Sequence, residues 1–232
     1  VKSNEYSESE PVRVGGSTYA TGMKAGQVRY DDAGNVIGSD DPTNHHVWRV
    51  RTDWSTADLT RDASNFYGYT SPTDATAEEI QNVKDQYEYD WNNWRADLGA
   101  PYDDVDNNGS YNPTVDVPGY PGADQTVWTI SNDVPTIVDA NGDSIAYSNT
   151  SEWLYGSDPV GVELQVTVWA YKLESEKPLG NAIYKRAKLI YTGLEPGSQY
   201  INPEVLDTVY FTQWSDLSLI HISEPTRQAA IS

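Results

Sequence analysis

The segment from Asp104 to Ser110 carries the side chains of this chain that are best spaced to bind a cation. Oxygen-bearing side chains alternate at Asp104, Asp106 and Asn108, and Gly109 follows where a loop must turn sharply. In a calcium loop of the EF-hand type, the carboxylates and amides at the first, third and fifth positions face one centre. The spacing therefore predicts the first half of a calcium-binding loop.

The second half of this loop departs from the EF-hand pattern. Val115 stands where the bidentate glutamate belongs, and Asp116 follows one residue later. Pro113 and Pro118 argue against a following helix. We therefore expect a helix-free calcium loop whose ligands are Asp104, Asp106, Asn108, Ser110 and Asp116. The alternative is a solvated turn, because Asp, Asn and Gly form turns without any metal.

The composition favours cations as charged partners. The chain has 15 Lys and Arg against 35 Asp and Glu, which gives a formal net charge of −20. This balance opposes binding to nucleic acid or to an anionic membrane through a basic surface. It also makes an unfilled cluster of carboxylates costly, which favours calcium as the cofactor. The lack of cysteine excludes disulfides, thiolate zinc sites and a thiol nucleophile.

The usual signatures of catalysis are missing from the sequence. There is no Gly-x-Ser-x-Gly elbow, phosphate-binding loop or His-Glu-x-x-His motif. His45 and His46 would point to opposite faces of a strand, so we expect no joint metal binding. Pairs of carboxylates such as Glu88 and Asp90 could hydrolyse glycosides only if they faced each other across a cleft. Most such groups are solvated surface charges, so we predict no catalytic residues.

One helix is predicted to pack on the rest of the domain. Thr76 and Glu79 form a capping box, and Gly99 stops the pattern. Between them an apolar stripe recurs at helical spacing. Its members are Ile80, Val83, Tyr87, Trp91, Trp94 and Leu98. We therefore expect an amphipathic helix at about 76–98.

Strands are predicted along much of the remaining chain. Two hairpins are expected, between Gln27 and Ile37 and around the Asn-Gly turn at 140–143. Alternating side chains predict further strands at 46–51, 162–169, 182–192 and 208–214.

The last three predicted strands suggest an antiparallel meander. In the first of them the apolar positions are Val162, Leu164, Val166 and Val168. This apolar face needs a second layer, which the earlier strands and the helix can provide. The predicted fold class is mainly β, an antiparallel β-sandwich with one added amphipathic helix.

The predicted domain is a single β-rich unit over residues 1–216, a fragment of a larger protein. The segment Leu217–Arg227 resembles the translation of a sequencing adapter that contaminates environmental assemblies. We therefore expect residues 217–232 to be a non-native tail. The alternative is a real apolar strand, Leu217–Ile222, with a polar end. No stretch approaches the length of a membrane span, so no membrane insertion is expected.

Motifs spread along the chain resemble one family. They are Arg13–Tyr19, Tyr89–Trp91, Gly99–Tyr102, the loop with Asn108 and Gly109, Pro118–Gln125, Tyr155–Pro159, Pro178–Asn181 and Gln213–Asp216. The family consists of large secreted bacterial proteins without an established reaction, which often end in a type IX secretion sorting domain. The resemblance implies an extracellular or outer cell surface location. It carries no catalytic residue over to this chain.

These observations leave three functions open. The first is a non-catalytic structural or adhesive module with a calcium-stabilised loop, whose partners are other domains of the same polypeptide. The second is glycan binding, in which Trp or Tyr rings stack on extracellular sugars. The third is a fragment of a carboxylate-based glycoside hydrolase.

Overall fold

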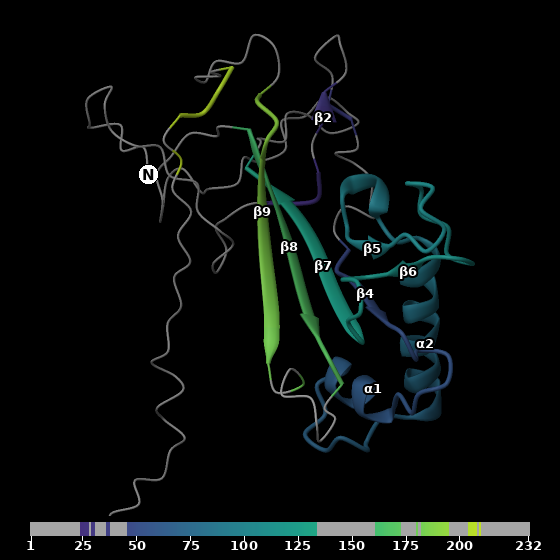
Figure 1. The fold of residues 1–232 in the computed structure, drawn as a ribbon. Coiled ribbons are helices and arrows are strands. Elements are labelled where there is room, and N and C mark those ends of the chain that lie inside the picture. Colours follow the sequence, from purple (N-terminus) through teal and green to yellow (C-terminus); the bar gives the residue numbers. More distant parts are fainter. Residues whose placement is uncertain are drawn as a thin grey trace, which may run out of the picture. The chain divides into compact units, whose positions relative to one another are not determined.

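A computed structural model gives the fold of the protein (Figure 1). It describes residues 24–27, 29–30, 36–37, 46–133, 161–172, 180, 182–194, 204–207 and 209. The chain separates into two units, Val1–Asn202 and Pro203–Ser232. All elements below belong to the first unit. The hairpin expected at 140–143, the strand at 208–214 except Val209, and the tail at 217–232 lie outside the described residues.

The described part of the chain is mainly β, as predicted. Its largest sheet is antiparallel and five-stranded, with the order β1-β7-β8-β9 and with β4 also paired to β7. These strands are β1 (Lys24–Ala25), β4 (Trp48–Arg51), β7 (Gln125–Asn132), β8 (Val162–Ala170) and β9 (Ile183–Tyr191). The central strand β7 is not among the predicted strands, whereas β4, β8 and β9 lie at predicted positions.

Two small ladders accompany this sheet. β2 (Arg29–Tyr30) pairs with β3 (Val36–Ile37), which confirms the hairpin predicted between Gln27 and Ile37. β5 (Tyr102–Asp103) pairs with β6 (Val117–Pro118). The second ladder encloses the predicted calcium loop.

The predicted helix begins where its capping box places it, but it ends earlier. α2 spans Ala77–Asn92, and both hydrogen bonds of the box join Thr76 and Glu79. Asn93 then caps the helix, and its side-chain amide donates to the carbonyl of Tyr89. A separate 3-10 turn, η2 (Ala96–Leu98), follows. The prediction of one helix to residue 98 is therefore wrong, because the chain turns at Asn93 to bring Trp94 into the core.

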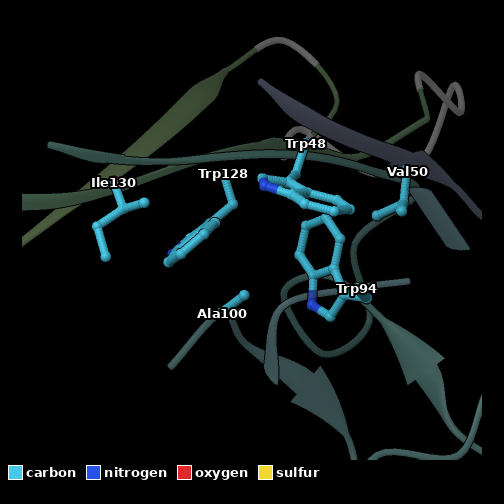
Figure 2. Close-up of a cluster of buried hydrophobic side chains, with 6 residues drawn as sticks. All are labelled: Trp48, Val50, Trp94, Ala100, Trp128 and Ile130. Atoms are coloured by element: carbon cyan, nitrogen blue, oxygen red, sulfur yellow. The ribbon is translucent and has the colours of Figure 1, made fainter. Parts of the chain in front are cut away.

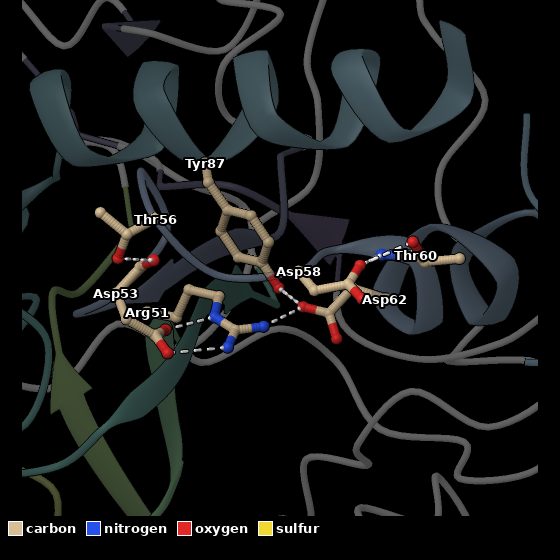
Figure 3. A network of polar contacts seen from close by, with 7 residues as sticks. All are labelled: Arg51, Asp53, Thr56, Asp58, Thr60, Asp62 and Tyr87. Atoms are coloured by element: carbon tan, nitrogen blue, oxygen red, sulfur yellow. Dashed lines mark hydrogen bonds and ion pairs between the residues drawn. The ribbon is translucent and has the colours of Figure 1, made fainter. Parts of the chain in front are cut away.

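The structure also contains a second α-helix that the sequence did not predict. α1 spans Thr60–Phe66. Arg51 at the end of β4 donates to Asp53 and Asp62, and the hydroxyl of Tyr87 on α2 also donates to Asp62 (Figure 3). These hydrogen bonds connect α1, α2 and the end of β4. Among the described residues no helix has the length and hydropathy that a membrane span requires.

The described residues of the first unit form two separate core clusters. One joins α1 to α2 through Leu59, Ala63, Val83 and Tyr87. The other joins the sheet to the segment after α2, and Figure 2 shows the indole of Trp94 lying against that of Trp48. Its buried members are Trp48, Val50, Trp94, Ala100, Trp128 and Ile130. The predicted helical stripe is therefore divided between two cores.

The second cluster lies on the polar face of β8. Trp128 pairs with Thr167 and Ile130 pairs with Gln165 across the β7–β8 ladder, and directly paired residues share a face. The Gln165 amide donates to the carbonyl of Leu98 at 2.7 Å. The segment after α2 thus covers the polar face of β8, whereas the sequence predicted cover for the apolar face. The apolar area on the covered face comes from β4 and β7.

Candidate metal centre

The β5–β6 ladder brings the two ends of the predicted calcium loop together. Asp103 pairs with Val117, so Asp104 and Asp116 are the next residues beyond the ladder on its two strands. Two carboxylates at such neighbouring positions repel each other, because like charges across a ladder are unfavourable. The fold therefore places two like charges close together at this end of the ladder.

Three of the predicted ligands form one acidic cluster. Asp104, Asp106 and Asp116 each offer a carboxylate oxygen, and these oxygens lie within 4.8 Å of one another. Asp116 is buried, Asp104 is half-buried and Asp106 is exposed. Such a cluster, open on one side, could hold a metal ion.

Backbone amides orient the two carboxylates at the ends of the loop. The N–H groups of Asn108 and Gly109 donate to the two oxygens of Asp104, at 3.1 and 2.8 Å. Those of Val105 and Asn112 donate to the two oxygens of Asp116, at 3.0 and 2.7 Å. Because a carboxylate oxygen has two lone-pair directions, one N–H bond to each leaves capacity for a cation.

The other two predicted ligands, Asn108 and Ser110, take part in bonds within the loop. The Asn108 amide nitrogen donates to Asp106 at 2.8 Å, and its carbonyl oxygen accepts the N–H of Ser110 at 2.7 Å. Both residues therefore shape the loop in this structure. The same bonds fit the solvated turn that the sequence left open.

The backbone needs left-handed residues at the tip of this loop. Asn107 has φ of 58° and Gly109 has φ of 76°. A Cβ atom on Gly109 would meet nothing within 4 Å, so its glycine serves the backbone conformation and not the packing. This confirms the sharp turn that the sequence predicted there.

The loop lies in a negative electrostatic environment. Ion pairs between described residues join His46 to Asp90, Arg51 to Asp53 and Asp62, and Arg95 to Asp97. None of them includes a carboxylate of the acidic cluster. Desolvation, followed by the charges of Asp104, Asp116 and Asp106, raises the pKa of Tyr102. Burial, followed by the charge of Asp116, raises the pKa of Tyr111.

The loop is docked on the last turns of α2 by reciprocal hydrogen bonds. The Tyr111 hydroxyl donates to the backbone carbonyl of Trp91. The Trp91 indole in turn donates to the carbonyl of Pro113 at 3.1 Å. Tyr111 also meets Tyr102 edge to face, at 5.5 Å between ring centroids, and both rings pack against the second core cluster. Order in the loop is thus linked to the end of α2 and to the sheet.

A second polar site, between β4 and α2, was not predicted from the sequence. Asp90 is fully buried and accepts from His46 at 2.6 Å, from the Gln86 amide at 2.9 Å and from the backbone N–H of Arg49 at 2.8 Å. These bonds fix α2 against β4. His45, the other histidine of the pair for which no joint metal binding was expected, lies outside the described residues.

The aromatic side chains at one end of β8 stack on one another. Tyr120 and Trp169 are parallel, with ring centroids 3.9 Å apart, and Tyr184 stacks on Trp169 at 5.6 Å. Tyr171 meets Tyr184 edge to face. The facing sides of these rings are occupied by each other, which does not favour this group as a sugar-stacking platform.

No protein-family profile, curated protein or solved structure matches the chain. The chemistry of the candidate site therefore depends on its own geometry. That geometry is a closed loop with three convergent carboxylates, oriented by backbone amides and joined to both the helix and the sheet.

Proposed function

We propose that this chain is a non-catalytic structural or adhesive module of a secreted or cell-surface bacterial protein, and that calcium stabilises its loop from Asp104 to Asp116. The observation that carries the proposal is the convergence of Asp104, Asp106 and Asp116, whose carboxylate oxygens lie within 4.8 Å of one another. The resemblance to secreted proteins with type IX sorting domains supports the location.

The donor set favours calcium over other metals. The residues from Asp104 to Asp116 include no histidine or cysteine, the ligands that zinc and copper prefer. Calcium accepts six to eight oxygens in flexible geometry, whereas magnesium demands a near-ideal octahedron. Carboxylates, the Asn108 amide, the Ser110 oxygens and waters can supply a set of that size. Rotation of the Asn108 side chain would free its carbonyl oxygen from the N–H of Ser110. That oxygen could then bind the ion, which would complete the expected set of ligands.

The charge of the chain gives the ion its structural role. At −20, the molecule repels itself, and a divalent cation between three carboxylates removes one of the most concentrated parts of that repulsion. Because Tyr111 and Trp91 join the loop to α2, ordering of the loop also stabilises the helix and the core behind it. The proposal also includes a β-sandwich, in which a second sheet covers the apolar face of β8. That face carries Leu164, Val166 and Val168, which are half-buried.

Thermal unfolding with and without calcium tests the proposal. Calcium at a hundred times its dissociation constant should stabilise the folded protein by about 2.7 kcal/mol, and EDTA should reverse the shift. Magnesium at the same concentration should give a smaller shift. An unfolding midpoint that is the same in calcium and in EDTA would remove calcium from the account.

Two variants separate a metal site from an ordinary solvated turn. Asp106→Asn removes one ligand charge from the cluster and should abolish most of the calcium shift. Asp103→Asn is the matched control, because Asp103 is exposed, belongs to β5 and points away from its neighbour Asp104. A calcium shift that both variants lower equally would indicate only a general response to charge.

A further inference from the structure

Strand β9 lies at one edge of the five-stranded sheet, and within the described residues only β8 pairs with it. It is nine residues long. In an antiparallel pair, every second residue directs its N–H and C=O away from the partner strand. The outer side of Ile183–Ile190 therefore presents a row of backbone donors and acceptors that another strand can pair with.

This strand is basic within a strongly acidic chain. Its sequence, IYKRAKLIY, has three cations and no carboxylate, although the whole chain has 35 acidic against 15 basic residues. Lys185, Arg186 and Lys188 are all exposed. The β8 residues opposite them are valine, threonine and glutamine, and no ion pair in the described part of the chain includes them.

The cations flank both faces of the β9 edge. Side chains alternate along a strand, so Lys185 lies on one face while Arg186 and Lys188 lie on the other. Exposed apolar side chains stand near both ends of the strand, with Ile183 79% and Leu189 41% exposed. A partner at this edge would thus meet positive charge on either side of its backbone and apolar contacts near its ends.

From this arrangement we infer that the β9 edge binds an extended acidic segment of another polypeptide by strand addition. Backbone hydrogen bonds would supply the pairing, and carboxylates of the partner would compensate Lys185, Arg186 and Lys188. The strand predicted at 208–214 of this chain has no carboxylate and would leave the three cations uncompensated. A second copy of this chain does not fit either, because two paired β9 strands would oppose cation to cation. An anionic polysaccharide could match the charge but not the alternating backbone groups.

A synthetic peptide probe tests this inference on the full 232-residue chain. The probe is a labelled nine-residue peptide rich in glutamate and threonine, followed by fluorescence anisotropy at moderate salt. It should bind, and binding should slow amide hydrogen exchange of Ile183–Ile190. A peptide with lysine in place of glutamate should not bind. No binding of the acidic peptide, or binding without protection of β9, overturns the inference.

Methylated forms of the same peptide distinguish strand pairing from simple charge attraction. N-methyl groups on every second amide block hydrogen bonding along one edge of the extended peptide. Methylation of the odd-numbered amides blocks one edge, and methylation of the even-numbered amides blocks the other. One of these two forms should retain binding and the other should lose it. Equal binding by both forms, or binding of polygalacturonate with the same protection of β9, contradicts strand addition.

Charge-reversal variants locate the site. K185E/R186E/K188E should weaken binding of the acidic peptide by about tenfold or more, because three favourable cross-strand charge pairs become repulsive. The control R61E/K84E reverses two cations on α1 and α2, away from β9, and should bind almost as the unmodified chain does. Equal losses in both variants would place the binding elsewhere. Unchanged far-ultraviolet circular dichroism shows that both variants fold.

Discussion

At the residue scale, the grouping of acidic side chains along one segment was predictable, whereas contacts between distant residues were not. The alternation of Asp104, Asp106 and Asn108 is local, and the structure places two of these in the acidic cluster with Asp116. The bond from His46 to the buried Asp90 spans 44 positions of the chain. No sequence period relates two such residues. Only the packing of α2 on β4 brings them together.

Tyr87 gives a prediction about alkaline pH. Burial, with the charge of Asp62 adding to it, raises the pKa of the Tyr87 hydroxyl to about 12. Below pH 10 this group is protonated in both the folded and the unfolded states. Between pH 10 and about 12 only the unfolded state loses the proton, so the free energy of unfolding should fall, by about 2 kcal/mol in total.

Tyr87→Phe should therefore flatten the alkaline limb of a urea-unfolding series. At neutral pH it should cost about 1 kcal/mol, because the hydrogen bond to Asp62 is lost. Tyr67→Phe is the matched control, since Tyr67 is an exposed tyrosine at the end of α1. If the alkaline limb of the Tyr87→Phe protein is as steep as that of the unmodified chain, Tyr87 is not its source.

At the element scale, strong local signals were enough for the start of α2 but not for its end. The capping box of Thr76 and Glu79 is complete in the structure. The end depends on tertiary contacts, because the Trp94 indole donates to the carbonyl of Pro101 at 2.8 Å and is buried in the core. The helical spacing of Trp94 and Leu98 suggested that the helix continued. Packing against the sheet overrides it.

Strand β7 shows a different limit of sequence interpretation. Its residues Val127, Trp128, Thr129 and Ile130 are β-branched or aromatic, a signal that could have identified the strand. They do not separate into a polar and an apolar face, because β7 is central and both of its faces are covered to some degree. The period-2 pattern is weak in such strands. The strands that pair with β7 are β1, β4 and β8, which lie far from it in the sequence.

The capping box predicts a measurable contribution to stability. Thr76→Ala removes the side-chain acceptor for the N–H of Glu79 and should cost about 1 kcal/mol of the free energy of unfolding. Thr73→Ala, at an exposed position just before the helix, should cost much less. Chemical denaturation of the three proteins measures both differences. Equal stabilities would show that the box contributes nothing.

Gly99 gives a prediction about the turn between α2 and the sheet. Its φ is 100°, and a Cβ atom there would lie 3.1 Å from the side-chain oxygen of Gln165. Gly99→Ala should destabilise the protein by more than about 1 kcal/mol, because both the conformation and the contact with Gln165 are disturbed. Gly68 also has a positive φ, of 76°, but a Cβ atom there would meet nothing within 4 Å, so Gly68→Ala should cost less. A thermal melt of both variants compares them.

At the scale of the whole molecule, net charge governs the response to salt. A chain of −20 repels itself, and added sodium chloride screens that repulsion. The unfolding midpoint in EDTA should therefore rise as salt is added. In saturating calcium the rise should be smaller, because the ion has already neutralised the cluster of Asp104, Asp106 and Asp116. Parallel salt dependences in calcium and in EDTA would contradict this coupling.

The central claim is that one calcium ion closes the loop between β5 and β6. A crystal grown in millimolar calcium tests it directly through the anomalous scattering of the ion. The account predicts a single peak among Asp104, Asp106 and Asp116, at about 2.3 to 2.6 Å from their oxygens. The three carboxylates turned outward into solvent, with no anomalous peak between them, would contradict it.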